Sequence, residues 1–189
     1  MYTLWGYEVE TLPDLLTVDE FNEITGDVFA DNAGVSYAIS AVSQAIRNYC
    51  GWHVSPNVEC TTNITAQGSY IVLPSVLVTD VKSVTDNGVE LTDYEYSRQG
   101  LVRGAKPFTA KLDGVKIIFN SGIDNDPTLK NITAQIVSNA IAAPAGVSRE
   151  TAGEIEIRYN ELGEGMSGGI SLMERDRMLL APYKLAVVV

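Results

Sequence analysis

Three stretches of this chain carry helix signals, and in the two longer ones apolar residues recur at helical spacing. The first stretch is short. Thr17 and Glu20 form a capping box, in which the hydroxyl accepts the amide of the third helical residue and the carboxylate reaches back to the cap. Gly26 is placed to end the helix, because glycine readily takes the left-handed conformation. The pattern therefore predicts a helix of roughly two turns between these signals.

The second stretch predicts a long helix from Asn32 to about Tyr49, with Asp31 as its cap and Gly51 as its end. The opposite side of this helix is small and only mildly polar, which favours cover by neighbours on both sides. The apolar stripe consists of Val35, Ile39, Val42, Ile46 and Tyr49.

The third stretch has a helix start signal and a helix stop signal. Asp126 is the predicted cap, and Pro127 follows at the first helical position, where its missing amide costs nothing. Pro144 is expected to stop the helix. The apolar stripe consists of Leu129, Ile132, Ile136 and Ala140.

The chain after this helix predicts three shorter features. Glu154 to Tyr159 alternates between polar and apolar residues and predicts a strand, and Gly163 to Gly169 predicts a glycine-rich loop. A short helix is expected from Glu174 to Leu180, with Ser171 as its candidate cap and Pro182 at its end.

Between the second and third helices, from about Val58 to Asn120, the pattern changes to short strands. Asn87-Gly88 is a hairpin turn signal, because both residues tolerate positive φ. A hairpin meander is the expected topology. The predicted strands lie in Ser69–Pro74, Val76–Thr85, Leu91–Tyr96, Leu101–Arg103 and Val115–Phe119.

Together these elements predict an α+β fold. About three main helices and a short C-terminal helix form a small bundle, and the β-rich insert lies between the second and third main helices. The expected organisation is an N-terminal extension (1–16), a single domain (17–183) and an apolar tail (184–189). Within the domain, residues 17–56 and 126–183 form the helical body, and residues 57–125 form the insert.

Composition excludes several functions. The 189 residues carry 24 acids and 13 bases, a net charge of −11, without a run of lysine or arginine. Gripping a phosphate backbone needs clustered cations, so we expect DNA to pass near this protein without binding. The N-terminal residues do not resemble a signal peptide, and no run reaches the length of a membrane span, which favours a cytosol-like compartment.

Cys50 and His53 resemble a nucleophile and its base. Both follow the end of a predicted helix, however, and the dipole at that end disfavours a thiolate. We therefore interpret the segment as a packed helix terminator and expect no enzymatic activity. Cys50 and Cys60 could still pair, although no secretion signal accompanies them. The predicted packing residues are Tyr49, Cys50, Gly51, Trp52, His53 and Pro56.

Other apparent sites are weak. Cys50, His53 and Cys60 supply at most three of the four ligands of structural zinc, so no metal is expected. The glycines between Gly163 and Gly169 match a nucleotide-binding string but lack the βαβ context that such a site needs. The sequence predicts no cofactor.

The C-terminal region has the character of an interface. Alternating charges on a short helix are typical of a subunit contact or a solvated face, and an apolar chain end should be docked on its own domain or on a partner. The candidate subunit or portal contacts are Glu174, Arg175, Asp176, Arg177, Tyr183, Leu185, Val187 and Val189.

In order and spacing, five pieces of the chain resemble the head-to-tail adaptor proteins of tailed bacteriophages, also called head–tail connector or head completion proteins. They span nearly the whole sequence, and the residues before Thr17 match less clearly. The pieces are Arg47 to Pro56; Leu73 to Ser75 with Val81 to Val84 and Asn87 to Leu91; Tyr94 to Leu101; Gly153 to Tyr159; and Arg175 to Arg177 with Leu180 to Tyr183.

The resemblance implies a structural virion protein of the phage neck, assembled in the bacterial cytoplasm. Such adaptors form a ring, typically a dodecamer, that joins the portal to a stopper or tail-side protein and extends the DNA channel. The resemblance implies no enzymatic step. The alternative is a β-rich tail or baseplate module that recognises a protein or host surface. That module would expose aromatic residues of the insert such as Tyr94, Tyr96 and Phe108.

Overall fold

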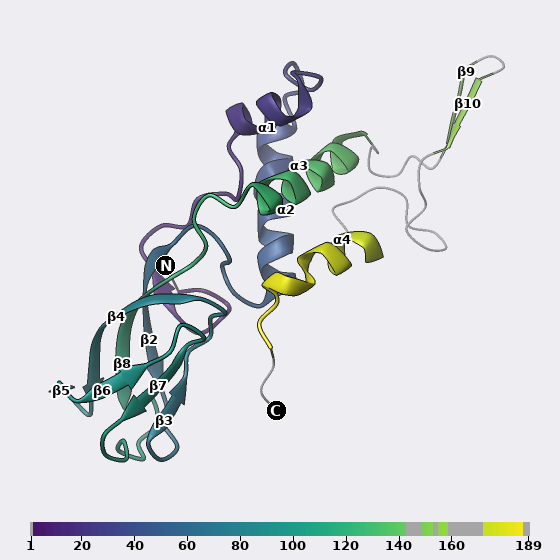
Figure 1. The fold of residues 1–189 in the computed structure, drawn as a ribbon. Helices are drawn as coiled ribbons and strands as arrows, with labels where there is room; N and C mark the ends of the chain where they lie inside the picture. Colours follow the sequence, from purple (N-terminus) through teal and green to yellow (C-terminus); the bar gives the residue numbers. More distant parts are fainter. Residues whose placement is uncertain (1, 143–148, 153–154, 159–171, 187–189) are drawn as a thin grey trace. The chain divides into compact units, whose positions relative to one another are not determined.

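The computed structural model describes residues 2–142, 149–152, 155–158 and 172–186, and divides the chain into two compact units (Figure 1). A strand-rich unit contains residues 1–13, 50–125 and 182–189, and a helical unit contains residues 14–49 and 126–181. The two units are described in turn.

The strand-rich unit is built on an antiparallel five-stranded sheet in the order β1-β2-β8-β4-β5. β2 and β8 pair over their whole length, from Val58 opposite Ser121 to Ile64 opposite Val115. β4 pairs on the other side of β8 with two irregularities in register. The strands are β1 (Glu8–Val9), β2 (Val58–Ile64), β4 (Val78–Asp86), β5 (Val89–Leu91) and β8 (Val115–Ser121).

A second sheet of three strands has the order β3-β7-β6, formed by β3 (Tyr70–Val72), β6 (Tyr94–Tyr96) and β7 (Leu101–Gly104). Buried side chains of both sheets form one cluster, which includes Ile71 and Val102 as well as Ile117 and Phe119. The two sheets therefore share a single core.

The topology is only partly the expected meander. The β4–β5 hairpin turns at Asn87 and Gly88, which have φ of +47° and +86°, as the turn signal predicts. β6 and β7 form a second hairpin. β8, however, returns between β2 and β4, because the alternating apolar residues of these long strands pair across distant parts of the chain.

Residues of the N-terminal segment belong to this unit. β1 extends the sheet by pairing with β2, and Tyr7 and Val9 are buried in the shared core. Residues 50–56 also belong to the strand-rich unit, although the sequence pattern grouped them with the helices.

In the helical unit, α1 (Val18–Thr25) has the predicted capping box at Thr17 and Glu20, and Gly26 ends it in the left-handed conformation with φ of +63°. α3 (Pro127–Ala142) begins at Asp126, whose Oδ1 accepts the Thr128 amide at 2.8 Å. α3 packs against both α1 and α4 (Glu174–Leu180). The unit also contains the antiparallel pair β9 (Arg149–Ala152) and β10 (Ile155–Arg158).

α2 (Val35–Cys50) begins later than expected, and just before it the side chain of Asn32 accepts the Gly34 amide at 2.8 Å. Its apolar stripe from Val35 to Ile46 is buried, and so is Ser43, whose Oγ accepts the Leu15 amide at 2.9 Å. The expected stop at Pro144, the glycine-rich loop and the cap at Ser171 lie outside the described residues. Among those that are described, no helix is both long and apolar enough to cross a bilayer.

Candidate functional site

The turn that follows α2 is held by the C-terminal segment of its own unit. Gly51 has φ of +78°, which ends the helix. Trp52 is fully buried, and its Nε1 donates to the carbonyl of Tyr183 at 2.6 Å. The Leu185 amide donates to the carbonyl of Cys50 at 2.8 Å. Residues 183–185 are therefore held by hydrogen bonds to the helix terminator that was predicted at residues 50–53.

His53 is fully buried and joins three distant parts of the chain. Its Nε2 lies 2.9 Å from the carbonyl oxygen of Ser121, and its Nδ1 lies 2.8 Å from Oη of Tyr7. The backbone amide of His53 also donates to the Tyr7 oxygen at 2.9 Å. Because a carbonyl can only accept, Nε2 carries a proton, and in the neutral imidazole Nδ1 then accepts from the tyrosine hydroxyl. For the neutral ring the geometry thus selects one tautomer.

Both cysteines are free and buried. Burial raises the pKa of the Cys50 thiol to about 12, and the nearby Lys184 ammonium opposes this shift without cancelling it. Burial also raises the pKa of the Cys60 thiol to about 12, with a further increase from Glu59. Both thiols are therefore protonated near neutral pH, and a protonated thiol is a poor nucleophile.

The segment after His53 is folded tightly against the end of β8. The Ser55 amide donates to the His53 carbonyl at 2.8 Å, and Val54 between them has φ of +66°, the geometry of a γ-turn. Positive φ is strained for a β-branched residue. The Val54 carbonyl accepts the Ile123 amide at 2.8 Å, which ties the turn to the chain leaving β8.

This close approach explains why residue 122 is a glycine. Gly122 has φ of +125°, and a Cβ at this position would overlap the carbonyl of Pro56 and lie 2.8 Å from Cα of Asn57. Any side chain here would separate the start of β2 from the end of β8. Tyr7, Ser121 and Gly122 are thus parts of this site that no local signal marks.

The candidate interface residues of α4 differ in exposure. Asp176 is buried and its Oδ2 accepts the Met173 amide at 3.0 Å, so it caps its own helix. Glu174, Arg175 and Arg177 are exposed, and Glu174 pairs with Arg177 over 4.0 Å. Tyr49 donates its hydroxyl to the Arg177 carbonyl at 3.1 Å, which joins the end of α2 to α4. Val187 and Val189 lie outside the described residues.

The aromatic residues expected on a binding module are not gathered on the surface. Phe108 is 5% exposed and belongs to the core. Tyr94 is half-buried and donates to the Val81 carbonyl at 3.2 Å, whereas Tyr96 is 42% exposed. The prediction of an exposed cluster of all three is therefore wrong, because Phe108 fills the core beneath the loop after β7.

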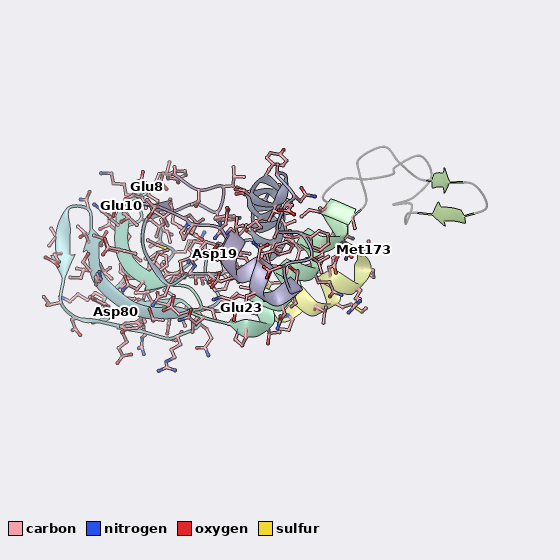
Figure 2. All side chains as sticks on the ribbon, turned by 90° about the horizontal axis from the view of Figure 1, so that it is seen from above. Glu8, Glu10, Asp19, Glu23, Asp80 and Met173 are labelled. Atoms are coloured by element: carbon pink, nitrogen blue, oxygen red, sulfur yellow. The ribbon has the colours of Figure 1, made fainter. Side chains whose placement is uncertain are left out.

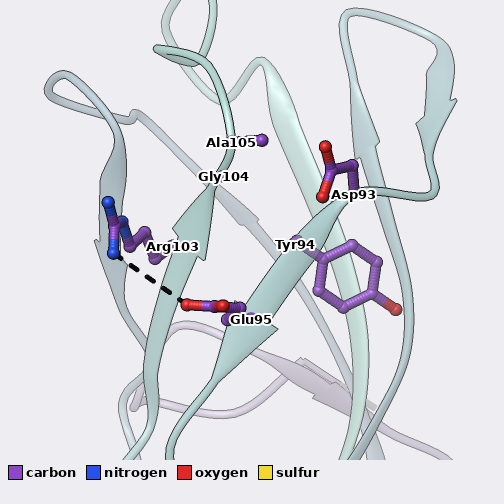
Figure 3. Close-up of a pocket in the computed structure, with 6 residues that line it drawn as sticks. All are labelled: Asp93, Tyr94, Glu95, Arg103, Gly104 and Ala105. Carbon is purple, nitrogen blue, oxygen red and sulfur yellow. Dashed lines mark ion pairs between the residues drawn. The ribbon is translucent and has the colours of Figure 1, made fainter.

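A shallow hollow lies beside β6 and β7, lined by residues 93–95 and 103–105. Its charged side chains do not converge on a common point: Arg103 and Glu95 lie together, and Asp93 lies apart from them (Figure 3). Across the residues whose placement is described, no group of three histidine, cysteine or acidic side chains could hold a metal ion.

Two solved structures share this fold over nearly the whole chain. One is a chain of the neck of an empty GTA (gene transfer agent, phage-like) particle determined with C6 symmetry: TM-score 0.61, 16% identity, with 97% of each chain covered. The other is from the neck of a native GTA particle determined with C12 symmetry: TM-score 0.56, 13% identity, covering 95% of this chain and 97% of that chain. Comparison with protein families found no matching family, and comparison with curated proteins found no match.

At these identities the likeness establishes the fold. The expectation of a mixed α+β fold is confirmed at that level.

Proposed function

We propose that this protein is a structural component of the neck of a tailed-phage-like particle, in which its copies form a closed ring. The observation that carries the proposal is the fold shared over 97% of both chains with a protein of a particle neck. A match over the whole length argues for a common role more strongly than a shared motif would, since it includes both the helical and the strand-rich units.

The Cys50–His53 segment supports a structural role. Its thiol is protonated, its imidazole is engaged on both nitrogens, and its tryptophan is buried. Within the strand-rich unit, these residues hold the turn at residues 50–53 to the N-terminal segment and to the end of β8. On this proposal the protein has no enzymatic step and no cofactor.

We further propose that the ring is an adaptor between the portal of the filled head and a stopper or tail-side protein, located in the virion and assembled in the bacterial cytoplasm. We expect twelve copies, as in the C12 symmetry of the native neck. The bundle with a β insert, expected from sequence, is then the adaptor domain. Its exposed Glu174, Arg175 and Arg177, together with the chain end, are the proposed contacts with the portal or a neighbouring copy.

The net charge of −11 fits a channel through which DNA slides. An acidic wall repels the phosphate backbone and releases no counterions on contact, so it gains little by binding. We expect the purified ring to bind double-stranded DNA no better than non-specifically at physiological salt.

Mass photometry of the purified protein, alone and mixed with its portal protein, tests the proposal. We expect a closed oligomer, or co-assembly on the portal ring, with class averages in electron microscopy showing rotational symmetry. A chain that stays monomeric at micromolar concentration and also fails to join the portal would exclude the adaptor role.

A further inference from the structure

The outer face of the three-stranded sheet carries apolar side chains that no described residue of its own unit covers. Val72 and Leu101 are cross-strand partners in the β3–β7 ladder and remain 53% and 40% exposed. Tyr70, two residues before Val72, lies on the same face and is 51% exposed. Its cross-strand partner is Arg103. We call these four residues the Tyr70–Leu101 face.

This face carries an exposed arginine in a strongly acidic protein. The Arg103 guanidinium lies 5.8 Å from the centroid of the Tyr70 ring, a cation–π arrangement that orients the arginine on the face. Arg98, in the turn that joins β6 to β7, is also exposed. One acid is close: Glu95 lies 4.0 Å from Arg103, and both side chains are mostly exposed (Figure 3). An ion pair this long and solvated is weak, so Arg103 can accept a second carboxylate.

The outer side of α1 has the opposite character. Asp19 and Glu23 are exposed one turn apart (Figure 2), with Val18 and Ile24 beside them at 40% and 42% exposure. Like charges at this spacing disfavour the helix slightly. Glu20 differs because Lys130 of α3 neutralises it at 2.6 Å. From residue 14 to residue 46 the chain has no lysine or arginine.

We propose that the Tyr70–Leu101 face of one copy docks on the outer side of α1 of the next copy, with Arg103 placed between Asp19 and Glu23. The proposal rests on the ring of the proposed function. A ring needs two different, complementary patches on every subunit, and these two combine apolar area with opposite charge. DNA and anionic membranes are excluded as occupants of the α1 patch because they would repel its carboxylates.

A charge swap between the two patches tests this contact. Arg103→Glu and Glu23→Lys should each raise the protein concentration at half-assembly at least about tenfold, because each sets like charges against each other. The double variant, R103E with E23K, should restore assembly to near the wild-type concentration. Mass photometry across a dilution series gives these values, and thermal melts confirm that each variant is folded.

Lys116→Glu is the matched control, since it makes the same charge change at an exposed position of the other sheet. It should leave assembly unchanged. If R103E forms rings as readily as the wild type, or if the double variant assembles no better than the single variants, this contact is wrong. The proposed ring itself would be unaffected by either result. Loss of portal binding with the ring intact would also overturn the contact, by assigning the face to the portal. A wild-type chain that forms no ring would refute the ring and this contact together.

Discussion

His53 connects chain segments that lie far apart in sequence, and its two ring nitrogens have opposite roles. Nε2 donates to Ser121 and Nδ1 accepts from Tyr7. In the printed sequence the same histidine stands three residues from a cysteine and suggests chemistry. Burial changes its role, because a buried polar group is stabilising only when every partner is present.

Replacing His53 or its partner Tyr7 should therefore lower the stability of the fold. We expect His53→Ala to lower the free energy of unfolding by about 3–5 kcal/mol, because it leaves a cavity and removes the buried partners of Tyr7 and Ser121. Tyr7→Phe deletes only the hydroxyl and should cost about 1–3 kcal/mol. Urea denaturation measures both values.

Tyr70→Phe is the control for the tyrosine change, because Tyr70 is 51% exposed whereas Tyr7 is fully buried. Its unfolding should match that of the wild type. A Tyr7→Phe variant as stable as the wild type would show that the buried network contributes nothing to stability.

Gly122 has a second residue-scale role, which is steric. Gly122→Ala places a methyl group on the Pro56 carbonyl, so the start of β2 and the end of β8 must separate. We expect a loss of about 3 kcal/mol or more in the free energy of unfolding. Gly68→Ala is the matched control: Gly68 also has positive φ, +74°, but has open space around it. It should cost only about 1 kcal/mol. Equal losses in the two variants would contradict the steric explanation.

At the scale of elements, signals that act within a few residues predicted the structure well. The Thr17–Glu20 box and the Asp126-Pro127 start are local hydrogen-bond chemistry, and both are present. Pairings between distant segments were not predictable. β1 is two residues long and carries no pattern of its own, and β2 meets β8 after fifty residues of intervening chain (65–114). Tyr7 and Ser121 were not predicted as parts of the candidate site for the same reason, because they meet His53 only through pairings between distant segments.

The α1 cap also predicts a pH dependence. Hydrogen bonds from Lys130 and from the Thr17 amide lower the pKa of the Glu20 carboxyl in the folded state. A carboxyl with a lowered folded pKa stabilises the fold above its unfolded-state pKa, about 4.3, and this contribution is lost as the pH falls through the folded value. Part of the loss of folding stability at acidic pH therefore comes from protonation of Glu20 in α1.

Lys130→Met should weaken this effect. We expect it to reduce the stability difference between pH 6 and about pH 3, since the bonds to Thr17 remain and only the lysine contribution is lost. Urea titrations at several pH values measure the difference. Lys116→Met removes an equal charge from an exposed position and should leave the pH profile of the wild type. Identical profiles for all three proteins would show that Glu20 is not stabilised by Lys130.

At the scale of the whole molecule, charge and assembly are linked. Copies with a net charge of −11 repel one another, so a ring must place its few exposed bases against acids. Assembly should weaken when such pairs are disrupted, as the Arg103 and Glu23 variants test. Composition predicted the repulsion, but the positions of the exposed bases required the structure.

The chain end permits a test of partner binding that leaves the fold intact. Because the Leu185 amide is bonded to Cys50 and the Tyr183 carbonyl to Trp52, deleting residues 184–189 would disturb the terminator as well as any partner contact. Deleting only residues 187–189 keeps both bonds. If the apolar end reaches the portal or a neighbouring copy, this shorter deletion should weaken ring assembly or portal binding at least about tenfold while the melting temperature stays unchanged. Unchanged assembly and portal binding after the short deletion would remove the chain end from the interface and leave the exposed residues of α4 to account for it.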